Sequence, residues 1–140
     1  MKGYLLVRAG GQQYGLPVAR VLEVGDATEV LSIPRKLPSV RGLTPLRGRL
    51  VPLVHLGAFL KGDEVPPPGV EAAAARTVVL VELGASGKQV AFEVDDVDAV
   101  VREHPLPVPR GQALAWASGV AEHEDGLVPI LDLDALGDRI

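Results

Sequence analysis

Side chains that could catalyse a reaction or bind a metal are few in this sequence, and they are widely spaced. The chain contains no cysteine, which excludes disulfides, thiolate metal sites and a cysteine nucleophile. The three histidines, His55, His104 and His123, do not follow a metal-ligand spacing such as H-E-x-x-H. His104 precedes a proline and His123 lies in the polar segment "EHEDG", so both are expected in exposed turns. We therefore expect no catalytic residue, no bound metal and no cofactor.

Two further segments resemble ligand-binding motifs but lack the required spacing. In "GASGK" (84–88) two residues separate the glycines, whereas a phosphate-binding loop needs four, and Gln89 stands where Ser or Thr would bind magnesium. "EVDDVD" (93–98) lacks the spacing and the closing glutamate of an EF-hand calcium loop. The first segment favours a hairpin turn, and the second favours a strand that bends from core to solvent.

Charge is distributed unevenly along the chain. The net charge is −4, yet residues 30–62 contain no acid. The rest of the chain therefore has 8 bases and 18 acids, or −10. The window itself contains six bases: Arg35, Lys36, Arg41, Arg47, Arg49 and Lys61. This asymmetry indicates either a solvated loop or a surface that faces an anion or a partner. Nucleic-acid binding would also need stacking aromatics, and this window contains only Phe59. A small β-barrel module that binds an anionic ligand or nucleic acid through 35–61 remains an alternative function.

The elements that must position these side chains are predicted to be short strands. Glycine and proline separate Val- and Leu-rich runs at 4–9, 12–17, 20–26, 49–56, 77–83, 88–94 and 126–133, a pattern typical of an all-β sandwich or barrel. Short helices are expected at 55–61, at 132–138 and within 70–76. With 47% hydrophobic and 4% aromatic residues, the core should be aliphatic. The first ten residues hold too short an apolar run for a signal peptide or membrane span, which favours a cytoplasmic protein.

The sequence also contains an internal repeat. "RLVPLVHLGAFL" (49–60) and "GLVPILDLDAL" (126–136) align at an offset of 77, and 11–24 overlies 87–100 at an offset of 76. The alignment places His55 on Asp132, which predicts a polar position at a strand end. We expect one domain over 1–140 with a first subdomain at about 10–62, a mobile linker at 63–75 and a second subdomain at about 76–137. The first strand could belong to either subdomain, and a groove is expected between them.

Several segments resemble one known family. "GLTPLRGRLVPLVHL" (42–56) is similar to the G-x-x-N-L-R-G-x-x-V-P-[IV]-[VI]-D-L line of the CheW family, the adaptor proteins of bacterial chemotaxis arrays. The segments 4–24, 90–101 and 119–136 resemble the family's other motifs, so the resemblance covers roughly residues 3 to 137. Pro45 departs from the usual Asn and His55 from the usual Asp. Because proline fixes φ and removes an N–H group, Pro45 predicts a local difference from the family's loop.

The resemblance implies a fold and a function. The fold would be all-β, with two packed five-stranded SH3-like barrels and short helices, and each repeated line would form the last strand and helix of one barrel. The protein would be a non-catalytic adaptor that couples chemoreceptors to a CheA-type histidine kinase in chemotaxis or a related motility system. Its partners would be the kinase regulatory domain and the cytoplasmic tip of the receptor, without nucleic acid or direct membrane insertion.

The resemblance also implies five partner-binding residues: Val21, Glu23, Gly42, Arg47 and Gly48. In an extended strand, Val21 and Glu23 would face one side and Leu22 the other, so the first two could form a contact pair. For Arg47 two roles remain open. Its guanidinium either contacts a partner directly or satisfies carbonyl groups of nearby loops.

Overall fold

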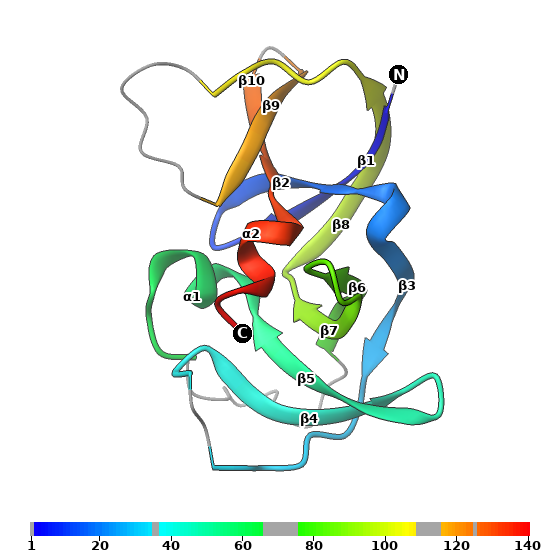
Figure 1. Cartoon of the computed structure of the whole chain (residues 1–140), viewed down its shortest axis with the longest axis vertical. Coiled ribbons are helices and arrows are strands. Elements are labelled where there is room, and N and C mark those ends of the chain that lie inside the picture. The colour runs from blue at the N-terminus through cyan, green and yellow to red at the C-terminus, as the bar shows by residue number, and fades with distance from the viewer. Residues whose placement is uncertain (1, 35–36, 66–75, 109–115, 125) are drawn as a thin grey trace.

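A computed structural model describes residues 2–34, 37–65, 76–108, 116–124 and 126–140, and in these residues two five-stranded sheets form the architecture (Figure 1). Sheet A has the order β8-β1-β2-β10-β9 and consists of β1 (Lys2–Ala9), β2 (Gln12–Pro17), β8 (Asp96–Glu103), β9 (Ala117–His123) and β10 (Gly126–Leu131). Sheet B has the order β3-β6-β7-β5-β4 and consists of β3 (Val21–Ala27), β4 (Val40–Leu46), β5 (Arg49–His55), β6 (Arg76–Leu83) and β7 (Lys88–Glu93). The predicted all-β fold is confirmed.

Three short helical segments connect or end these strands. The 3-10 helix η1 (Val18–Arg20) carries the chain from β2 in sheet A to β3 in sheet B, while α1 (Leu56–Lys61) follows β5 and α2 (Leu133–Gly137) follows β10. Two of the three expected helices are thus present, and each forms the second part of a repeated line. The third, within 70–76, and most of the expected linker lie outside the described residues. None of the helices described is long and apolar enough to cross a membrane.

The two sheets do not follow the halves of the chain. Hairpin β1–β2 from the first half pairs with β8 and β10, and hairpin β6–β7 from the second half pairs with β3 and β5. A whole hairpin therefore crosses in each direction, rather than a first strand alone. The two hairpins have similar apolar patterns, so the patterns could not indicate this exchange.

The repeat nevertheless occupies equivalent places in the two sheets. β5 lies between antiparallel β4 and parallel β7, and β10 lies in the same way between β9 and β2. β4 and β9 each contain a bulge at the same relative position, between Val40 and Gly42 and between Ala117 and Gly119. The structure therefore supports the prediction that 51–56 and 128–133 are equivalent.

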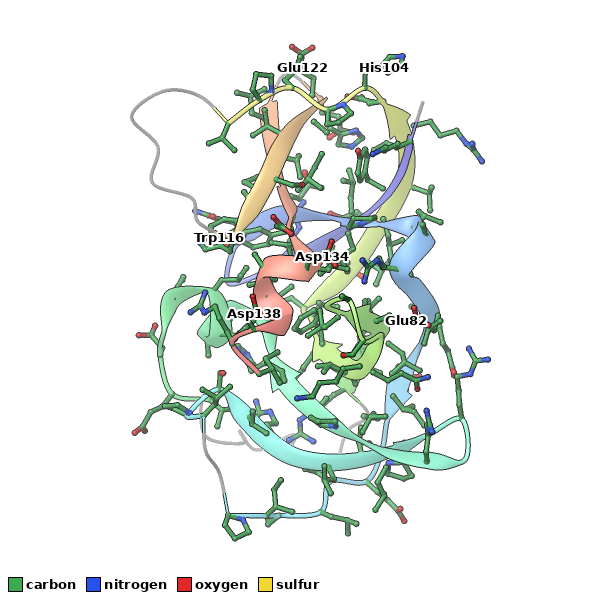
Figure 2. All side chains as sticks on the ribbon, in the orientation of Figure 1. Glu82, His104, Trp116, Glu122, Asp134 and Asp138 are labelled. Atoms are coloured by element: carbon green, nitrogen blue, oxygen red, sulfur yellow. The ribbon has the colours of Figure 1, made fainter. Side chains whose placement is uncertain are left out.

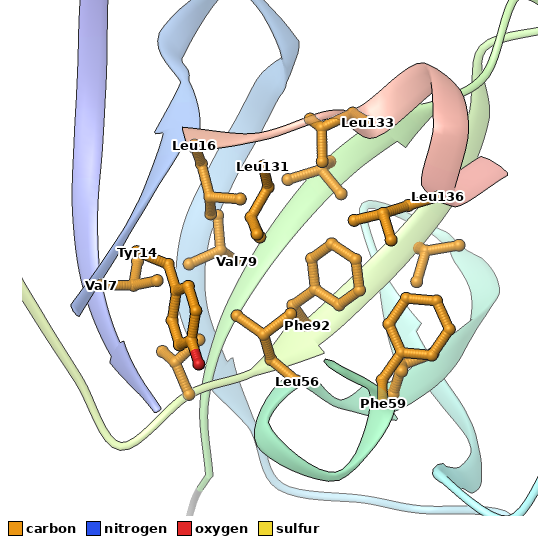
Figure 3. Packing of buried hydrophobic residues seen from close by; sticks show 14 of the residues in the cluster. Val7, Tyr14, Leu16, Leu56, Phe59, Val79, Phe92, Leu131, Leu133 and Leu136 are labelled. Atoms are coloured by element: carbon orange, nitrogen blue, oxygen red, sulfur yellow. The ribbon is translucent and has the colours of Figure 1, made fainter. Parts of the chain in front are cut away.

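A shared hydrophobic core fills the space between the sheets (Figure 3). It combines residues of sheet A such as Leu16 and Leu131 with residues of sheet B such as Val79 and Phe92, all of which have no exposed surface. Leu136 of α2 and Phe59 of α1 pack on it, and Phe59 stacks on Phe92 with ring centroids 6.2 Å apart. Smaller clusters lie within each sheet. The core is mainly aliphatic, as expected, and it joins the two repeats into one unit.

The two helices are capped by equivalent side chains. Asp132 Oδ1 accepts a hydrogen bond from the Ala135 N–H at 3.1 Å, and His55 Nδ1 accepts one from the Ala58 N–H at 3.1 Å. Such N-caps satisfy donors that the first helical turn leaves without partners. His55 is thus the strand-end polar residue that the repeat predicted, and its imidazole takes the place of a capping carboxylate.

Candidate partner-binding surfaces

The predicted pair Val21 and Glu23 lies at an irregular start of β3. The pairing with β6 shifts between them, because Val21 is opposite Val81 and Glu23 is opposite Leu80, which leaves Leu22 as a bulge. Val21 packs on the shared core and Leu22 packs on the cluster within sheet B. The simple alternation expected for this strand is therefore interrupted, and Val21 is partly buried. The most exposed apolar residue of β3 is Val24, at 48%.

Arg47 and Gly48 form the two-residue turn of the β4–β5 hairpin. Both have positive φ, 51° and 75°, and Leu46 pairs with Arg49 on either side, which is the geometry of a type I′ turn. Arg47 Nη1 donates to the Leu22 carbonyl at 3.3 Å. The guanidinium therefore contacts a backbone carbonyl while remaining exposed, and it brings the hairpin turn beside the bulge that separates Val21 from Glu23.

Gly42 is buried and has a packing role. A Cβ atom at this position would lie 2.2 Å from the Leu31 carbonyl oxygen, because Leu31 and Leu43 exchange backbone hydrogen bonds. Gly119 repeats the arrangement in sheet A, where a Cβ would lie 2.7 Å from the Leu106 oxygen. Gly42 therefore allows the preceding loop to approach β4. Of the five predicted residues, Glu23, Arg47 and Gly48 lie close together at the surface of sheet B.

An apolar face lies next to this hairpin turn. Cross-strand pairing places Leu43 opposite Pro52 and Pro45 opposite Leu50, and Leu31 bridges to Leu43, so the five side chains share the outer face of β4–β5. Leu31 is 50% exposed and Leu50 is 53% exposed. We call this set the hairpin face: Leu31, Leu43, Pro45, Leu50 and Pro52. Exposed apolar groups gathered in this way are typical of a protein-interaction surface.

Pro45 belongs to strand β4 and does not distort a loop. The Leu43 N–H group points away from β5 and donates to the Leu31 carbonyl. Pro45 lies two residues further along the strand, so the N–H group that it lacks would also face the open edge of the sheet. At the equivalent place in β9, the Glu122 N–H donates to Glu103 Oε2 at 3.0 Å. Both edges are thus closed to further strand pairing, by different means.

A groove of about 600 Å³ opens on the side of sheet A. Its lining comes from β1, the β2–η1 junction, β8, β9 and the β10–α2 junction, and it includes two exposed apolar side chains, Val18 (41%) and Val100 (59%). The groove that the sequence predicted was to lie between the two subdomains. The shared core fills that space, and this groove lies beside it, along η1 and α2.

Arg20 forms one wall of the groove. Its Nη2 donates to Asp134 Oδ1 at 2.5 Å, and its Nη1 donates to the Gly84 carbonyl at 3.0 Å. These bonds connect η1 to α2, on which Figure 2 marks Asp134, and to the turn after β6. The wall is therefore fixed by contacts between elements of both sheets.

The equivalent end of sheet B contains a cluster of ionic side chains. Arg41 Nε donates to Glu93 Oε1 at 2.6 Å and Arg41 Nη2 donates to Glu93 Oε2 at 3.1 Å. Arg76 Nε lies 3.2 Å from Oε1, and His55 Nε2 lies 3.7 Å from Oε2. These side chains are only 12% to 20% exposed. We call them the ionic cluster: Arg41, His55, Arg76 and Glu93.

Burial lowers the pKa of His55 from its ordinary value. Glu93 and Asp95 act in the opposite direction, and Arg41 adds to the lowering. The neutral imidazole is also the form that the helix cap requires, because a protonated Nδ1 cannot accept the Ala58 N–H. Geometry and electrostatics therefore agree on a neutral His55 near pH 7.

The groove and the ionic cluster occupy the same positions of the repeat. Four residues that line the groove are Lys2, Pro17, Ser118 and Asp132. The strand pairings make them equivalent, in this order, to Arg76, Glu93, Arg41 and His55. Individual side chains did not indicate the groove, but the repeat alignment did contain a signal. Overlaying 11–24 on 87–100 puts a proline where the other copy has a glutamate.

The described residues form two five-stranded sheets around a shared core, with an apolar hairpin face on one sheet and a groove with exposed apolar side chains on the other, and such surfaces are typical of a protein-interaction module. The chain belongs to the CheW family, because the family model of the CheW-like domain matches residues 3–140. Membership of this family supports a role as an adaptor in chemotaxis signal transduction. The structure is similar to that of the scaffolding protein TtCheW from Thermoanaerobacter tengcongensis, with a TM-score of 0.77 and 23% identity over 94% of this chain and 89% of that one.

Proposed function

We propose that this protein is a non-catalytic adaptor that couples chemoreceptors to a CheA-type histidine kinase in the cytoplasm. The observation that carries the proposal is the presence of two separate apolar surfaces in one small chain. The hairpin face lies on sheet B, and the groove with Val18 and Val100 lies on sheet A. An adaptor must bind two partners at once, and surfaces on different sheets meet that requirement.

The kinase regulatory domain is assigned to the surface around Glu23, Arg47, Gly48 and the hairpin face. Arg47 contacts the Leu22 carbonyl, so Glu23 lies beside the hairpin turn, and Leu50 of the same hairpin is 53% exposed. An apolar centre with a charged rim is typical of contacts between proteins that assemble and separate. Gly42 and Val21 support this surface from beneath, Gly42 by admitting the Leu31 loop and Val21 by packing on the core.

Glu23→Lys tests this assignment. The substitution reverses a rim charge without removing core contacts, so the fold should persist while binding to the kinase regulatory domain weakens about ten- to a hundredfold. Titration calorimetry with the regulatory domain measures the affinity, and thermal unfolding checks the fold. Asp26→Lys is the matched control, because Asp26 is an exposed acid on the same strand. Equal weakening by both variants, or no binding by the wild-type chain, would contradict the assignment.

Binding of an anionic ligand or nucleic acid through 35–61 has less support. Arg41 pairs with Glu93 and is only 12% exposed, Arg47 and Arg49 lie at the hairpin turn, and Lys61 lies at the end of α1. Figure 1 shows α1 and the β4–β5 turn on opposite sides of sheet B. The described basic residues of this segment are therefore dispersed. Tight, salt-sensitive binding to an oligonucleotide, without binding to either signalling partner, would favour this alternative.

A further inference from the structure

We infer that Glu122 and Glu124 are specificity-determining residues: they prevent the kinase surface that docks on the hairpin face from docking on a second, similar face of this chain. The inference rests on the proposed assignment of the kinase regulatory domain to the hairpin face. It deepens that proposal, because it names the residues that direct the domain to one face. It follows from a comparison of two β-hairpins that the repeat makes equivalent, β4–β5 and β9–β10.

The β9–β10 hairpin of sheet A presents an apolar face of its own. Cross-strand pairing places Val120 opposite Pro129. It also places Glu122 opposite Leu127, so the four side chains share one face. Leu106 exchanges backbone hydrogen bonds with Val120 and joins this face. We call this set the sheet A face, and none of its residues lines the groove: Leu106, Val120, Glu122, Leu127 and Pro129.

The sheet A face and the hairpin face have nearly the same apolar residues. The matching pairs, with the hairpin face first, are Leu31 and Leu106, Leu43 and Val120, Leu50 and Leu127, and Pro52 and Pro129. Leu106 and Leu127 are 43% and 54% exposed, and their counterparts on the hairpin face are 50% and 53% exposed. Apolar contacts alone would therefore not direct a partner to one face rather than the other.

Charge distinguishes the two faces. Where the hairpin face has Pro45, the sheet A face has Glu122, and both residues are exposed. The first turn residue is Arg47 in one hairpin and Glu124 in the other, and both have positive φ, 51° and 46°. Glu124 is 84% exposed and lies 3.8 Å from His123 Nε2, while in the described part of the chain no cation pairs with Glu122. Two carboxylates thus replace a neutral residue and a cation.

A third carboxylate adds to this difference. Glu103 Oε2 accepts the Glu122 N–H at 3.0 Å, and the equivalent residue in sheet B is the buried Ala27. Glu103, Glu122 and Glu124 line a pocket of about 520 Å³ together with Leu127. Figure 2 marks Glu122 at the end of sheet A that lies away from sheet B. The exposed leucine of this hairpin therefore has acidic neighbours that Leu50 of the other hairpin lacks.

A kinase surface that fits the hairpin face is disfavoured on the sheet A face. The surface that covers Pro45 and Leu50 must be apolar, because it meets no charge there. On the sheet A face the same surface would cover the Glu122 carboxylate and remove it from water without a partner. An acidic group that gains from contact with Arg47 would instead meet Glu124. Burial of an unpaired charge and contact between like charges both oppose binding.

The test counts the kinase regulatory domains that the full chain binds, by titration calorimetry and by sedimentation of the complex. The wild-type chain should bind one domain. Glu122→Leu with Glu124→Arg should create a second site, so this variant should bind two domains. Arginine already occupies the equivalent turn position at the same positive φ, so the fold should persist, which thermal unfolding checks. Asp63→Leu with Glu64→Arg is the matched control, because it makes the same charge change at exposed residues after α1 and should leave the count at one.

A second pair of substitutions guards against a loss of folding. Glu122→Gln with Glu124→Gln removes the two charges and adds no apolar or basic group. This variant should also gain a second site, with lower affinity than the site created by leucine and arginine. A count of one for both double variants would overturn the inference and leave the kinase assignment intact.

Transfer of the binding site then identifies the face. Pro45→Glu in the wild-type chain should weaken binding about tenfold or more, and Pro45→Gln should have a smaller effect. Pro45→Glu combined with Glu122→Leu and Glu124→Arg should again bind one domain, now on the sheet A face. In that background Leu127→Glu should abolish binding, whereas Leu50→Glu should not.

The remaining outcomes are equally distinct. A wild-type chain that binds two domains would overturn the inference, because the carboxylates would then exclude nothing. A second site that persists in Leu127→Glu would also overturn it, because that site would lie elsewhere. If the wild-type chain binds no kinase regulatory domain, the proposed function fails and this inference fails with it.

Discussion

The two copies of the repeat differ in structure at the same end of their sheets. In sheet B, the carboxylate of Glu93 gathers Arg41, Arg76 and His55 into a cluster that is mostly closed to solvent. In sheet A, proline occupies the position of that glutamate, and the equivalent surface is an open groove with apolar walls. A duplicated scaffold can therefore stabilise one copy and leave the other available for binding.

The comparison also separates two kinds of residue within the candidate surfaces. Gly42 and Gly119 are equivalent, and both admit the carbonyl of a preceding loop, so they belong to the scaffold. Glu23, Pro17 and Lys2 differ in charge or shape from their equivalents Ala99, Glu93 and Arg76. Residues that are the same in the two copies serve packing, and residues that differ between the copies can serve partner recognition.

The largest expected effect comes from removing the centre of the ionic cluster. Glu93→Ala removes the carboxylate that Arg41 and Arg76 share, and both arginines have little exposure, so the variant should lose about 3–4 kcal/mol of unfolding free energy. Pro17→Ala, at the equivalent position, should change stability by less than about 1 kcal/mol. Urea unfolding of both variants measures the difference. A similar cost at the two positions would show that the ends of the sheets are not distinct.

The next largest effect is expected at Gly42 and Gly119, where the two copies of the repeat have the same packing. Gly42→Ala should destabilise the fold by about 3 kcal/mol, because the new Cβ meets a backbone oxygen and the residue has a φ of 156°. Gly119→Ala should cost less, about 1–2 kcal/mol, because its Cβ has more room and its φ is not in the positive range that the structure records. Chemical unfolding is again the measurement. A neutral Gly42→Ala would contradict its packing role and favour a direct partner contact.

Much of the scaffold could be predicted from the sequence, because local apolar patterns and turn residues determine strands. The repeat at offsets of 76 and 77 predicted which strands and helices are equivalent, and it predicted a polar role for His55. It could not predict the exchange of hairpins between the sheets. Pairing depends on contacts between distant strands, and β1 and β6 present similar apolar faces to either sheet.

The candidate surfaces were harder to predict. Alternation placed Val21 on an exposed face, but a bulge at Leu22 turns it toward the core. Arg47 could be expected near a carbonyl or near a partner, and the hydrogen bond to Leu22 is compatible with both because the side chain stays exposed. A groove was predicted between the subdomains, but its actual position could not be, because its lining comes from five separate segments that only the fold brings together.

Arg47→Asn separates the two roles of Arg47 and has a smaller expected effect on stability. Asn-Gly is the preferred pair for a type I′ turn, which should offset the lost hydrogen bond to Leu22 and keep the unfolding free energy within about 0.5 kcal/mol of the wild-type value. Binding to the kinase regulatory domain should weaken severalfold if the guanidinium contacts the partner. Lost stability with unchanged affinity would assign Arg47 to the hairpin alone.

The smallest expected effect concerns the two helix caps, and it appears as a pH dependence. The folded-state pKa of His55 is lowered, chiefly by burial, so the unfolded chain binds more protons than the folded chain just below the ordinary histidine pKa of about 6.5. Stability contributed by this residue is therefore complete above about pH 6.5 and is lost as the pH falls toward the lower folded value. The physical cause is local: burial disfavours the charged imidazole, and a protonated Nδ1 can no longer accept the Ala58 N–H. Arg41 adds to the lowering of the pKa, whereas Glu93 and Asp95 oppose it.

His55→Asp gives α1 the cap that Asp132 provides for α2. Because aspartate titrates near pH 4 in general, the variant should lose the decline in stability between about pH 6.5 and 5 while retaining the cap. Urea midpoints measured from pH 5 to 8 would show this as a flatter profile, with His104→Gln as a control for an exposed histidine that caps no helix. The new carboxylate lies near Glu93, but Arg41 and Arg76 offset that repulsion, so the cost near pH 7 should stay below about 1 kcal/mol. If the stability of the variant still declines between about pH 6.5 and 5, another group titrates in this range. The difference between the two helix caps would then not cause the loss of stability in acid.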